Sequence, residues 1–328
     1  MSKIPDHFLP SYSDASLEDA LFHYTTASGL MGILTTGKIW STAYYCTNDE
    51  SELAAGRGIL GPLFKSKTYD LIKANDQRVL KFAQRGVDIR EYAEQFEQFI
   101  VNMVFSSLCA FITCFCKPIG KEDFYHGLLS QWRGYGSDGG YALHFSRKKL
   151  MAAIDSANKS DKLDYDLRDV YYKTNNPMKD EIRIYADAFI SEYMSFLDEL
   201  AEPLDLNKKT GRNPISALPG GPLEALINYL VYTKNEHFIE ERECRLCLIQ
   251  PVSASDGCLS VQYFNKNGLL VPYIKTPASS FNVLDCLEWI IIGPGPRMDA
   301  RFKSVNQLVR QSERDIKVRA SQIPFSRF

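Results

Sequence analysis

Short runs of β-branched and aromatic residues lie in three distant parts of the chain, near residues 20–45, 110–145 and 240–320. Two long stretches with helical periodicity separate them, at about 51–107 and 180–235. Strands and helices therefore do not alternate regularly, as they would in a doubly wound parallel sheet. We predict an α+β fold in which distant segments assemble a split, mostly antiparallel sheet core, with the helices outside it.

The composition is that of a globular protein. A chain of 328 residues with 45% hydrophobic and 12% aromatic residues can bury a sizeable core, which excludes a disordered protein. The 38 basic and 40 acidic residues leave a net charge of −2, which does not indicate a general nucleic-acid-binding surface. We expect a single catalytic-type domain over residues 1–328, with helical insertions at about 51–107 and 180–235.

No segment has the pattern of a leader or of a membrane span. The first ten residues hold no apolar run, and the most apolar stretch, residues 101–115, is interrupted by polar residues. We therefore expect a cytoplasmic protein without membrane contact, whose eight cysteines are reduced. Cys244 and Cys247 form a CxxC pair without a second pair of ligands, so no metal is expected.

The tripeptide His23-Tyr24-Thr25 ends the first strand-like run, and a short helix that ends at Gly37 is expected to follow. Because side chains alternate along a strand, His23 and Thr25 share one face. An imidazole, a hydroxyl and the free N–H groups of a helix start can together hold a polar ligand. The alternative is a core histidine beside a capping threonine.

The segment Gln131-Trp132-Arg133-Gly134-Tyr135-Gly136 combines a guanidinium and two aromatic rings with two glycines. Such a set suits the phosphate or the ring of a nucleotide. A tight aromatic turn would use the same residues.

The segment Glu240-Glu241-Arg242-Glu243-Cys244-Arg245 is strongly charged. If residues 241–250 are extended, Glu241, Glu243 and Arg245 share one face. Two carboxylates this close repel each other, so a cationic ligand, a developing positive charge or Arg245 must compensate them. The alternative is a solvated edge strand with ion pairs.

Taken together, these segments resemble the bacterial domain-of-unknown-function family 2971. The resemblance extends over nearly the whole chain and is most specific in Ser130-Gln131-Trp132-Arg133-Gly134-Tyr135-Gly136. Cys244 stands where the resemblance leads us to expect an aromatic residue, and the stretch 202–222 has no counterpart. The other matching pieces are His23-Tyr24-Thr25 with Gly37-Lys38-Ile39-Trp40, Asn48-Asp49 with Glu52, Glu240 to Arg245, and Ile291-Ile292-Gly293-Pro294.

The N-terminal unit is also similar to the opening of ADP-ribosyltransferases of the DarT type and of tRNA 2′-phosphotransferases. This resemblance implies a sheet of the ADP-ribosyltransferase type and NAD as a substrate, without a metal. In it Glu243 would stabilise a ribosyl cation, and Glu241 would position or deprotonate the incoming nucleophile. The residues implied to bind NAD, or in part the acceptor, are His23, Thr25, Trp132, Arg133 and Tyr135.

The partners and the activity stay open. The acceptor would be a nucleic acid or a protein, and the role by analogy that of a toxin or phage-defence effector, as a homo-oligomer or with a defence-system partner. If Asp49 and the two glutamates bind a metal, the protein would be a metal-dependent nuclease or hydrolase. If the site is vestigial, it would be a nucleotide- or partner-binding sensor without chemistry.

Overall fold

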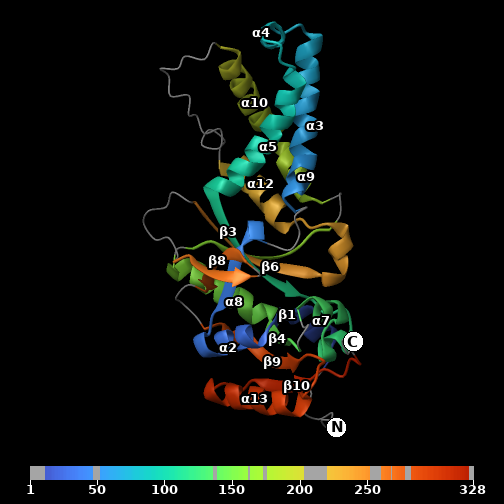
Figure 1. Ribbon diagram of the computed structural model, residues 1–328, viewed down its shortest axis with the longest axis vertical. Helices are drawn as coiled ribbons and strands as arrows, with labels where there is room; N and C mark the ends of the chain where they lie inside the picture. Colours follow the sequence, from blue (N-terminus) through green and yellow to red (C-terminus); the bar gives the residue numbers. More distant parts are fainter. Residues whose placement is uncertain are drawn as a thin grey trace.

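The computed structural model describes residues 12–46, 52–135, 139–161, 163–172, 176–202, 220–251, 260–266, 268–277 and 282–324. These residues form an elongated molecule with a sheet region at one end and a lobe of helices at the other (Figure 1). The strands are β1 (Ala20–Thr25), β2 (Ile39–Ala43), β3 (Leu108–Cys116), β4 (Tyr141–Ser146), β5 (Tyr165–Asp169), β6 (Glu243–Pro251), β7 (Gln262–Lys266), β8 (Leu269–Thr276), β9 (Leu287–Ile292) and β10 (Lys317–Ala320).

One ten-stranded sheet contains all of these strands. Its order is β10-β9-β4-β1-β3-β2-β8-β7, and β6 pairs with both β3 and β5. Among the described strands, the pairing of β9 with β10 is parallel and the other pairings are antiparallel. The predicted α+β class with a mostly antiparallel sheet is confirmed. The assignment of this sheet to the ADP-ribosyltransferase type stays a prediction.

The sheet splits at β3. Along one edge β3 pairs with β6 over its full length, from Leu108 opposite Pro251 to Cys116 opposite Glu243. Two strands share its other edge, since β2 meets it at Phe111 and Ile112 and β1 meets it at Cys116. The backbone of β3 between these two contacts, residues 113–115, therefore borders a gap between β1 and β2.

Helices cover both faces of the sheet and build the lobe. The α-helices are α1 (Asp14–Asp19), α2 (Ala27–Thr36), α3 (Glu52–Lys73), α4 (Gln77–Gln84), α5 (Ile89–Ser107), α6 (Lys121–His126), α7 (Leu129–Tyr135), α8 (Arg147–Asp161), α9 (Met178–Ile184), α10 (Ala186–Ala201), α12 (Gly220–Tyr232) and α13 (Met298–Gln311). Short 3₁₀ helices occupy Tyr44–Cys46, Glu236–Glu241 and Val283–Cys286.

The lobe consists of α3, α4, α5 and α10, and it extends away from the sheet (Figure 1). Its core contains Phe64, Phe96 and Tyr193, whose rings pack together with centroids 5.0 to 5.1 Å apart. The periodic apolar stripe of residues 92–103 forms the side of α5 that faces this core.

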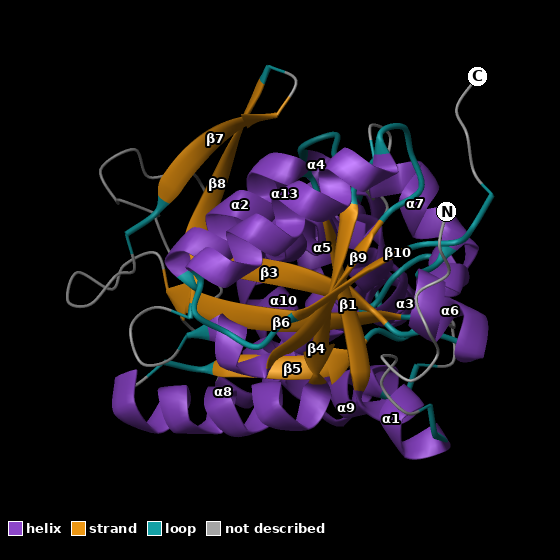
Figure 2. Cartoon of the chain, turned by 90° about the horizontal axis from the view of Figure 1, so that it is seen from below, coloured by secondary structure: helices purple, strands orange, loops and turns teal. Residues whose placement is uncertain are grey.

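Alternation along β3 and β6 gives the sheet two distinct faces. On one face Phe111, Phe115 and Leu246 pack with α2, α8 and α13, which flank the sheet in Figure 2. On the other face Ile112 and Cys247 pack against the helical lobe. At the β1 end this second face is covered by α6 and α7, through Phe124 and Trp132 among others. The second face is therefore covered by two separate groups of helices.

Two local interpretations were wrong. The segment that begins at Gln131 forms α7 up to Tyr135, so the alternative of a tight aromatic turn does not hold. Glu241 ends a 3₁₀ turn instead of lying in a strand, since Arg242 takes a left-handed conformation with φ 42° and β6 begins at Glu243.

Candidate functional site

A cavity of about 420 Å³ opens over the gap between β1 and β2, and we call it the main chamber. A second cavity of about 270 Å³, the side chamber, lies against α2. His23, Thr25, Trp40 and Phe264 line both, so the two chambers meet at the split edge of the sheet. The charged or hydroxyl-bearing residues lining the main chamber include Thr25, Tyr135, Lys234, Glu241, Glu243, Arg245 and Lys266.

His23 is held at the gap by a contact with the stretch of β3 that borders it. Its Nδ1 lies 3.0 Å from the carbonyl oxygen of Cys114. Because a carbonyl only accepts hydrogen bonds, Nδ1 carries the proton, and in the neutral ring Nε2 is an acceptor. Burial lowers the pKa of His23, and the bond to Cys114 opposes this only in part. The ring is therefore neutral near pH 7 and offers an acceptor to the cleft.

Thr25 is positioned by the start of α2. Thr26 caps this helix by accepting a hydrogen bond from the Gly29 N–H, and Gly37 ends it in the left-handed region with φ 65°. A Cβ atom on Gly29 would lie 2.0 Å from Oγ1 of Thr25. The strand and the following helix that the sequence predicts are thus confirmed, and Gly29 is required because Thr25 packs directly on the helix backbone.

Glu243 is the buried carboxylate of the site, with a side chain that is 1% exposed. Its Oε1 accepts a hydrogen bond from Nε of Arg245 at 2.7 Å, and Arg245 also donates to the carbonyl of Val231. Its own backbone N–H donates to the hydroxyl of Tyr172 at 2.7 Å. Burial alone would raise the pKa of Glu243, but Arg245 and Lys234 outweigh it and lower the pKa to about 2. Glu243 therefore stays ionised in the protein interior.

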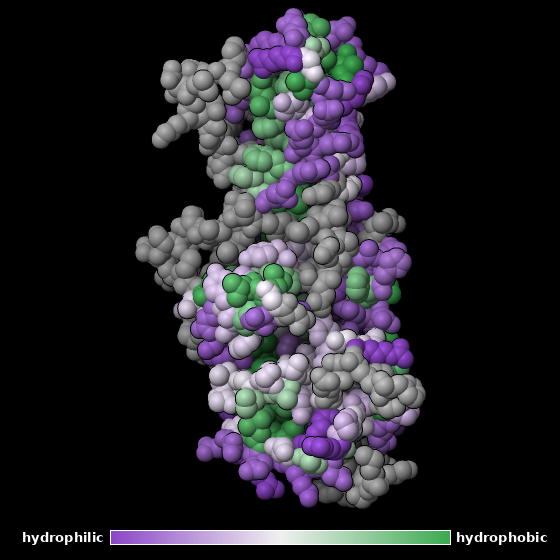
Figure 3. Space-filling model, viewed as in Figure 1, coloured by the Kyte–Doolittle hydropathy of each residue, from purple (hydrophilic) through white to green (hydrophobic). Residues whose placement is uncertain are grey.

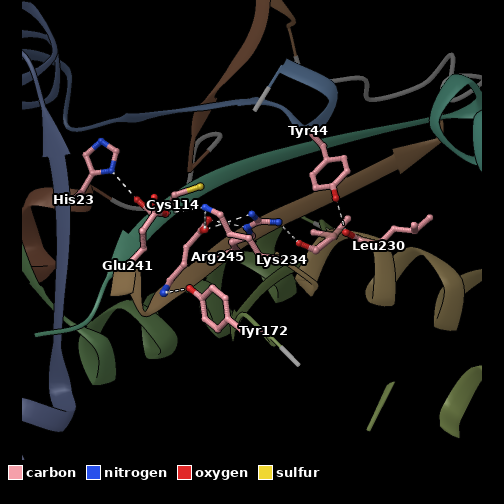
Figure 4. Close-up of polar contacts among 10 residues, drawn as sticks. His23, Tyr44, Cys114, Tyr172, Leu230, Lys234, Glu241 and Arg245 are labelled. Carbon is pink, nitrogen blue, oxygen red and sulfur yellow. Dashed lines mark hydrogen bonds and ion pairs between the residues drawn. The ribbon is translucent and has the colours of Figure 1, made fainter. Parts of the chain in front are cut away.

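Lys234 joins the two glutamates that the sequence singled out. Its Nζ donates to Oε2 of Glu241 and to Oε2 of Glu243, both at 2.7 Å, and lies 4.8 Å from the centre of the Phe238 ring. Burial would lower the pKa of Lys234, but the charges of Glu243 and Glu241 raise it above its usual range. Figure 4 shows Glu241, Lys234 and Arg245 close together, with His23 on the other side of Cys114.

Lys234 is the residue that the sequence reasoning missed. The compensation expected for the two carboxylates is supplied by Lys234 together with Arg245. Lys234 follows the end of α12 and stands outside β6, so no strand or helix periodicity connects it to Glu243. The apposition arises because Tyr171 pairs with Thr233, which places the next residue beside the start of β6.

The three residues of α7 that were expected to bind NAD lie in different surroundings. Tyr135 lines the main chamber. Trp132 is 1% exposed, packs edge-on against Tyr24 and donates from Nε1 to the carbonyl of His126 at 2.9 Å. Arg133 is exposed, and neither it nor Trp132 lines the chamber. The structure thus brings His23, Thr25, Tyr135, Glu241 and Glu243 together, and their roles stay predictions.

An aromatic wall of the cleft was also not predicted. Trp40 of β2 stacks on Tyr273 of β8, with ring centroids 4.2 Å apart, and Phe264 of β7 lies 5.5 Å from Trp40. Trp40 is 44% exposed, although a ring of this size is usually well buried. Alternation on β2 could have placed Trp40 on the face opposite Ile39, but not beside Phe264 of a strand more than 200 residues away.

The described residues contain neither a cluster of metal ligands nor a membrane-spanning helix. Within the described ranges, no group of three or more His, Cys, Asp or Glu could hold a metal ion. Asp49, which the metal interpretation requires, lies outside these ranges, as do most of the charged turn around it and residues 203–219. Across the part of the chain that the structure describes, no helix is long and apolar enough to cross a membrane.

The family resemblance is confirmed over residues 131–246 of the chain. The model of a family described as proteins of unknown function, DUF2971, matches residues 131–246. This segment contains most of α7 and the Lys234, Glu241, Glu243 and Arg245 cluster, whereas His23 and Thr25 lie outside it. No curated protein and no solved structure matches the chain.

Proposed function

We propose that this protein is an NAD-dependent ADP-ribosyltransferase that acts on a nucleic-acid or protein target. The observation that carries the proposal is that His23 and Thr25 line one chamber with Glu241 and Glu243, which lie more than 200 residues further along the chain. Its volume of about 420 Å³ is in the size range of small-molecule sites, roughly 300–1,000 Å³.

The proposed chemistry breaks the bond between the ribose C1′ and the nicotinamide nitrogen. The bonding electrons leave with neutral nicotinamide, and the ribose carries a developing positive charge. A buried, ionised carboxylate stabilises that charge more than it stabilises the neutral sugar, which is the requirement for catalysis. The low pKa of Glu243 keeps it in this form.

The remaining residues have complementary roles in the proposal. His23 offers Nε2, and Thr25 its hydroxyl, to orient NAD. Glu241 is the more exposed carboxylate, with a side chain 20% exposed against 1% for Glu243, so it is the one that an acceptor can approach. It would take the proton of the acceptor nucleophile as that nucleophile bonds to C1′.

Release of nicotinamide from NAD by the purified protein tests the proposal, with and without added nucleic acid, protein acceptor or chelator. Glu243→Gln should reduce turnover by on the order of 100-fold, since it keeps the shape but removes the charge. Glu241→Gln should reduce transfer more than hydrolysis to free ADP-ribose. The matched control is Glu192→Gln, which changes a buried carboxylate of α10 in the helical lobe and should leave turnover unchanged.

A second candidate is a nucleotide-binding sensor without chemistry. The observation in its favour is that Lys234 and Arg245 already neutralise both carboxylates. Nucleotide binding without nicotinamide release, in a protein whose fold is intact, would favour this candidate. Turnover that the chelator abolishes would instead favour the metal-dependent hydrolase.

A further inference from the structure

The side chamber has two unlike walls. On one side are the rings of Trp40 and Phe264, and on the other is the first turn of α2, with Thr26, Ser28 and Gly29. Figure 3 shows apolar side chains gathered over the β7–β8 hairpin and a hollow below them, toward α2. The chamber thus opens between an aromatic surface and a helix start.

The aromatic wall is suited to a planar ring. Trp40 is backed by Tyr273 at 4.2 Å, so its free face is held in a fixed orientation. The other two tryptophans, Trp132 and Trp289, are 1% and 2% exposed. A preorganised, solvent-facing aromatic ring is the usual platform on which a nucleobase stacks.

The opposite wall and the rim are suited to an anion. The start of a helix longer than two turns presents N–H groups and a partial positive charge, and the hydroxyls of Thr26 and Ser28 lie there, 3.0 Å apart. On the aromatic side, Lys275 is the direct cross-strand neighbour of Trp40 and is exposed. A cation beside the ring favours a ligand that carries negative charge together with its planar group.

We propose that the side chamber binds a nucleotide unit, with its base stacked on Trp40 and its phosphate at the start of α2. The unit can come from a free nucleotide, such as the adenylate half of a dinucleotide, or from one residue of a single-stranded nucleic acid. This binding does not depend on turnover in the main chamber, although the two chambers share His23 and Thr25.

Tryptophan fluorescence provides the measurement, because Trp40 is the exposed ring among the three tryptophans of the chain. AMP and a short single-stranded oligonucleotide are titrated separately into the full-length protein. We expect saturable quenching. Tighter binding of AMP identifies a free nucleotide as the source, and at least tenfold tighter binding of the oligonucleotide identifies a strand.

A glycine of α2 allows the chamber to be filled without disturbing the fold. A Cβ on Gly32 meets nothing within 4 Å, and Gly32 lines the side chamber, so Gly32→Leu should fill it and weaken binding at least tenfold. Gly58→Leu is the matched control, since Gly58 in α3 also has open space around its Cβ and lies outside both chambers.

The Trp40 variants test the stacking wall by calorimetry. Trp40→Leu should weaken binding by about tenfold or more, and Trp40→Phe much less, because phenylalanine keeps a stacking face.

Two results would overturn this inference: no quenching by either probe, or equal binding by Gly32→Leu and the wild type, with the fold verified by circular dichroism. The outcome is separable from that of the proposed function. Nucleotide binding without nicotinamide release would leave this inference standing and refute the enzyme. The opposite result would be nicotinamide release with unchanged kinetics in Gly32→Leu, together with no quenching by AMP or the oligonucleotide. That result would refute this inference and leave the proposed enzyme activity standing.

Discussion

Lys234 Nζ lies 2.7 Å from Oε2 of Glu243, in a position where both side chains are at most 10% exposed. The same ammonium binds Glu241, so one cation holds the two carboxylates of the cleft together. A buried charge that loses its partner is strongly destabilising, since the protein interior replaces little of its hydration. The stability of this part of the fold and the charge of the cleft are therefore coupled.

Replacing Lys234 should show this coupling. Lys234→Met leaves Glu243 with Arg245 alone, and we expect it to lower the free energy of unfolding by roughly 3–5 kcal/mol at pH 7. Combining it with Glu243→Gln should cost less than the sum of the two single changes, because the second removes the charge that the first left uncompensated. Urea unfolding of the four proteins provides the cycle. Additive losses would mean that the 2.7 Å contact carries no coupling.

The acid stability of the protein should depend on Glu243. Its pKa is lowered from 4.5 to about 2, so the folded state holds the ionised form more strongly than the unfolded chain does. The stabilisation is fully present above about pH 4.5, is on the order of 3 kcal/mol, and is lost as the pH falls toward 2. The difference in unfolding free energy between wild type and Glu243→Gln should therefore shrink over this range. A difference that stays constant from pH 6 to pH 2.5 would contradict the lowered pKa.

The two nitrogens of His23 should have separable roles. His23→Asn can keep a donor near Cys114 while removing the Nε2 acceptor, whereas His23→Ala removes both. We expect His23→Asn to unfold close to the wild-type urea concentration and His23→Ala to lose about 1 kcal/mol more. Both should lose NAD binding, measured by calorimetry. Wild-type NAD affinity in His23→Asn would show that Nε2 contacts no ligand.

Two glycines of the same helix should respond oppositely to alanine. Gly32→Ala meets open space and should stabilise α2 by up to about 1 kcal/mol, the helix-propensity difference between the two residues. Gly29→Ala gains the same propensity but places its Cβ 2.0 Å from Oγ1 of Thr25, so it should be net destabilising. Adding Thr25→Ala should recover part of that loss. Thermal unfolding compares the variants, and equal midpoints for Gly29→Ala and Gly32→Ala would show that Thr25 does not pack on the helix.

Local patterns in the sequence predicted the strands and the helix that surround the cleft. Alternation put His23 and Thr25 on one face of β1 and Glu243 with Arg245 on one face of β6, and both pairings hold in the structure. The predicted stop at Gly37 is the C-terminal limit of α2 in the structure. These features depend on side-chain geometry within a few residues, which the sequence states directly.

The tertiary structure decided which of these residues share a site and which do not. Trp132 lies in the core because α7 packs it against Tyr24. The sequence of a short helix does not show which of its sides will be covered. Lys234 contacts Glu243, and Trp40 lies beside Phe264, because backbone pairings bring distant segments of the chain together. The gap between β1 and β2 exists because the two strands pair with different parts of the same edge of β3. Such pairings are decided by the burial of the whole sheet, so no local pattern specifies them.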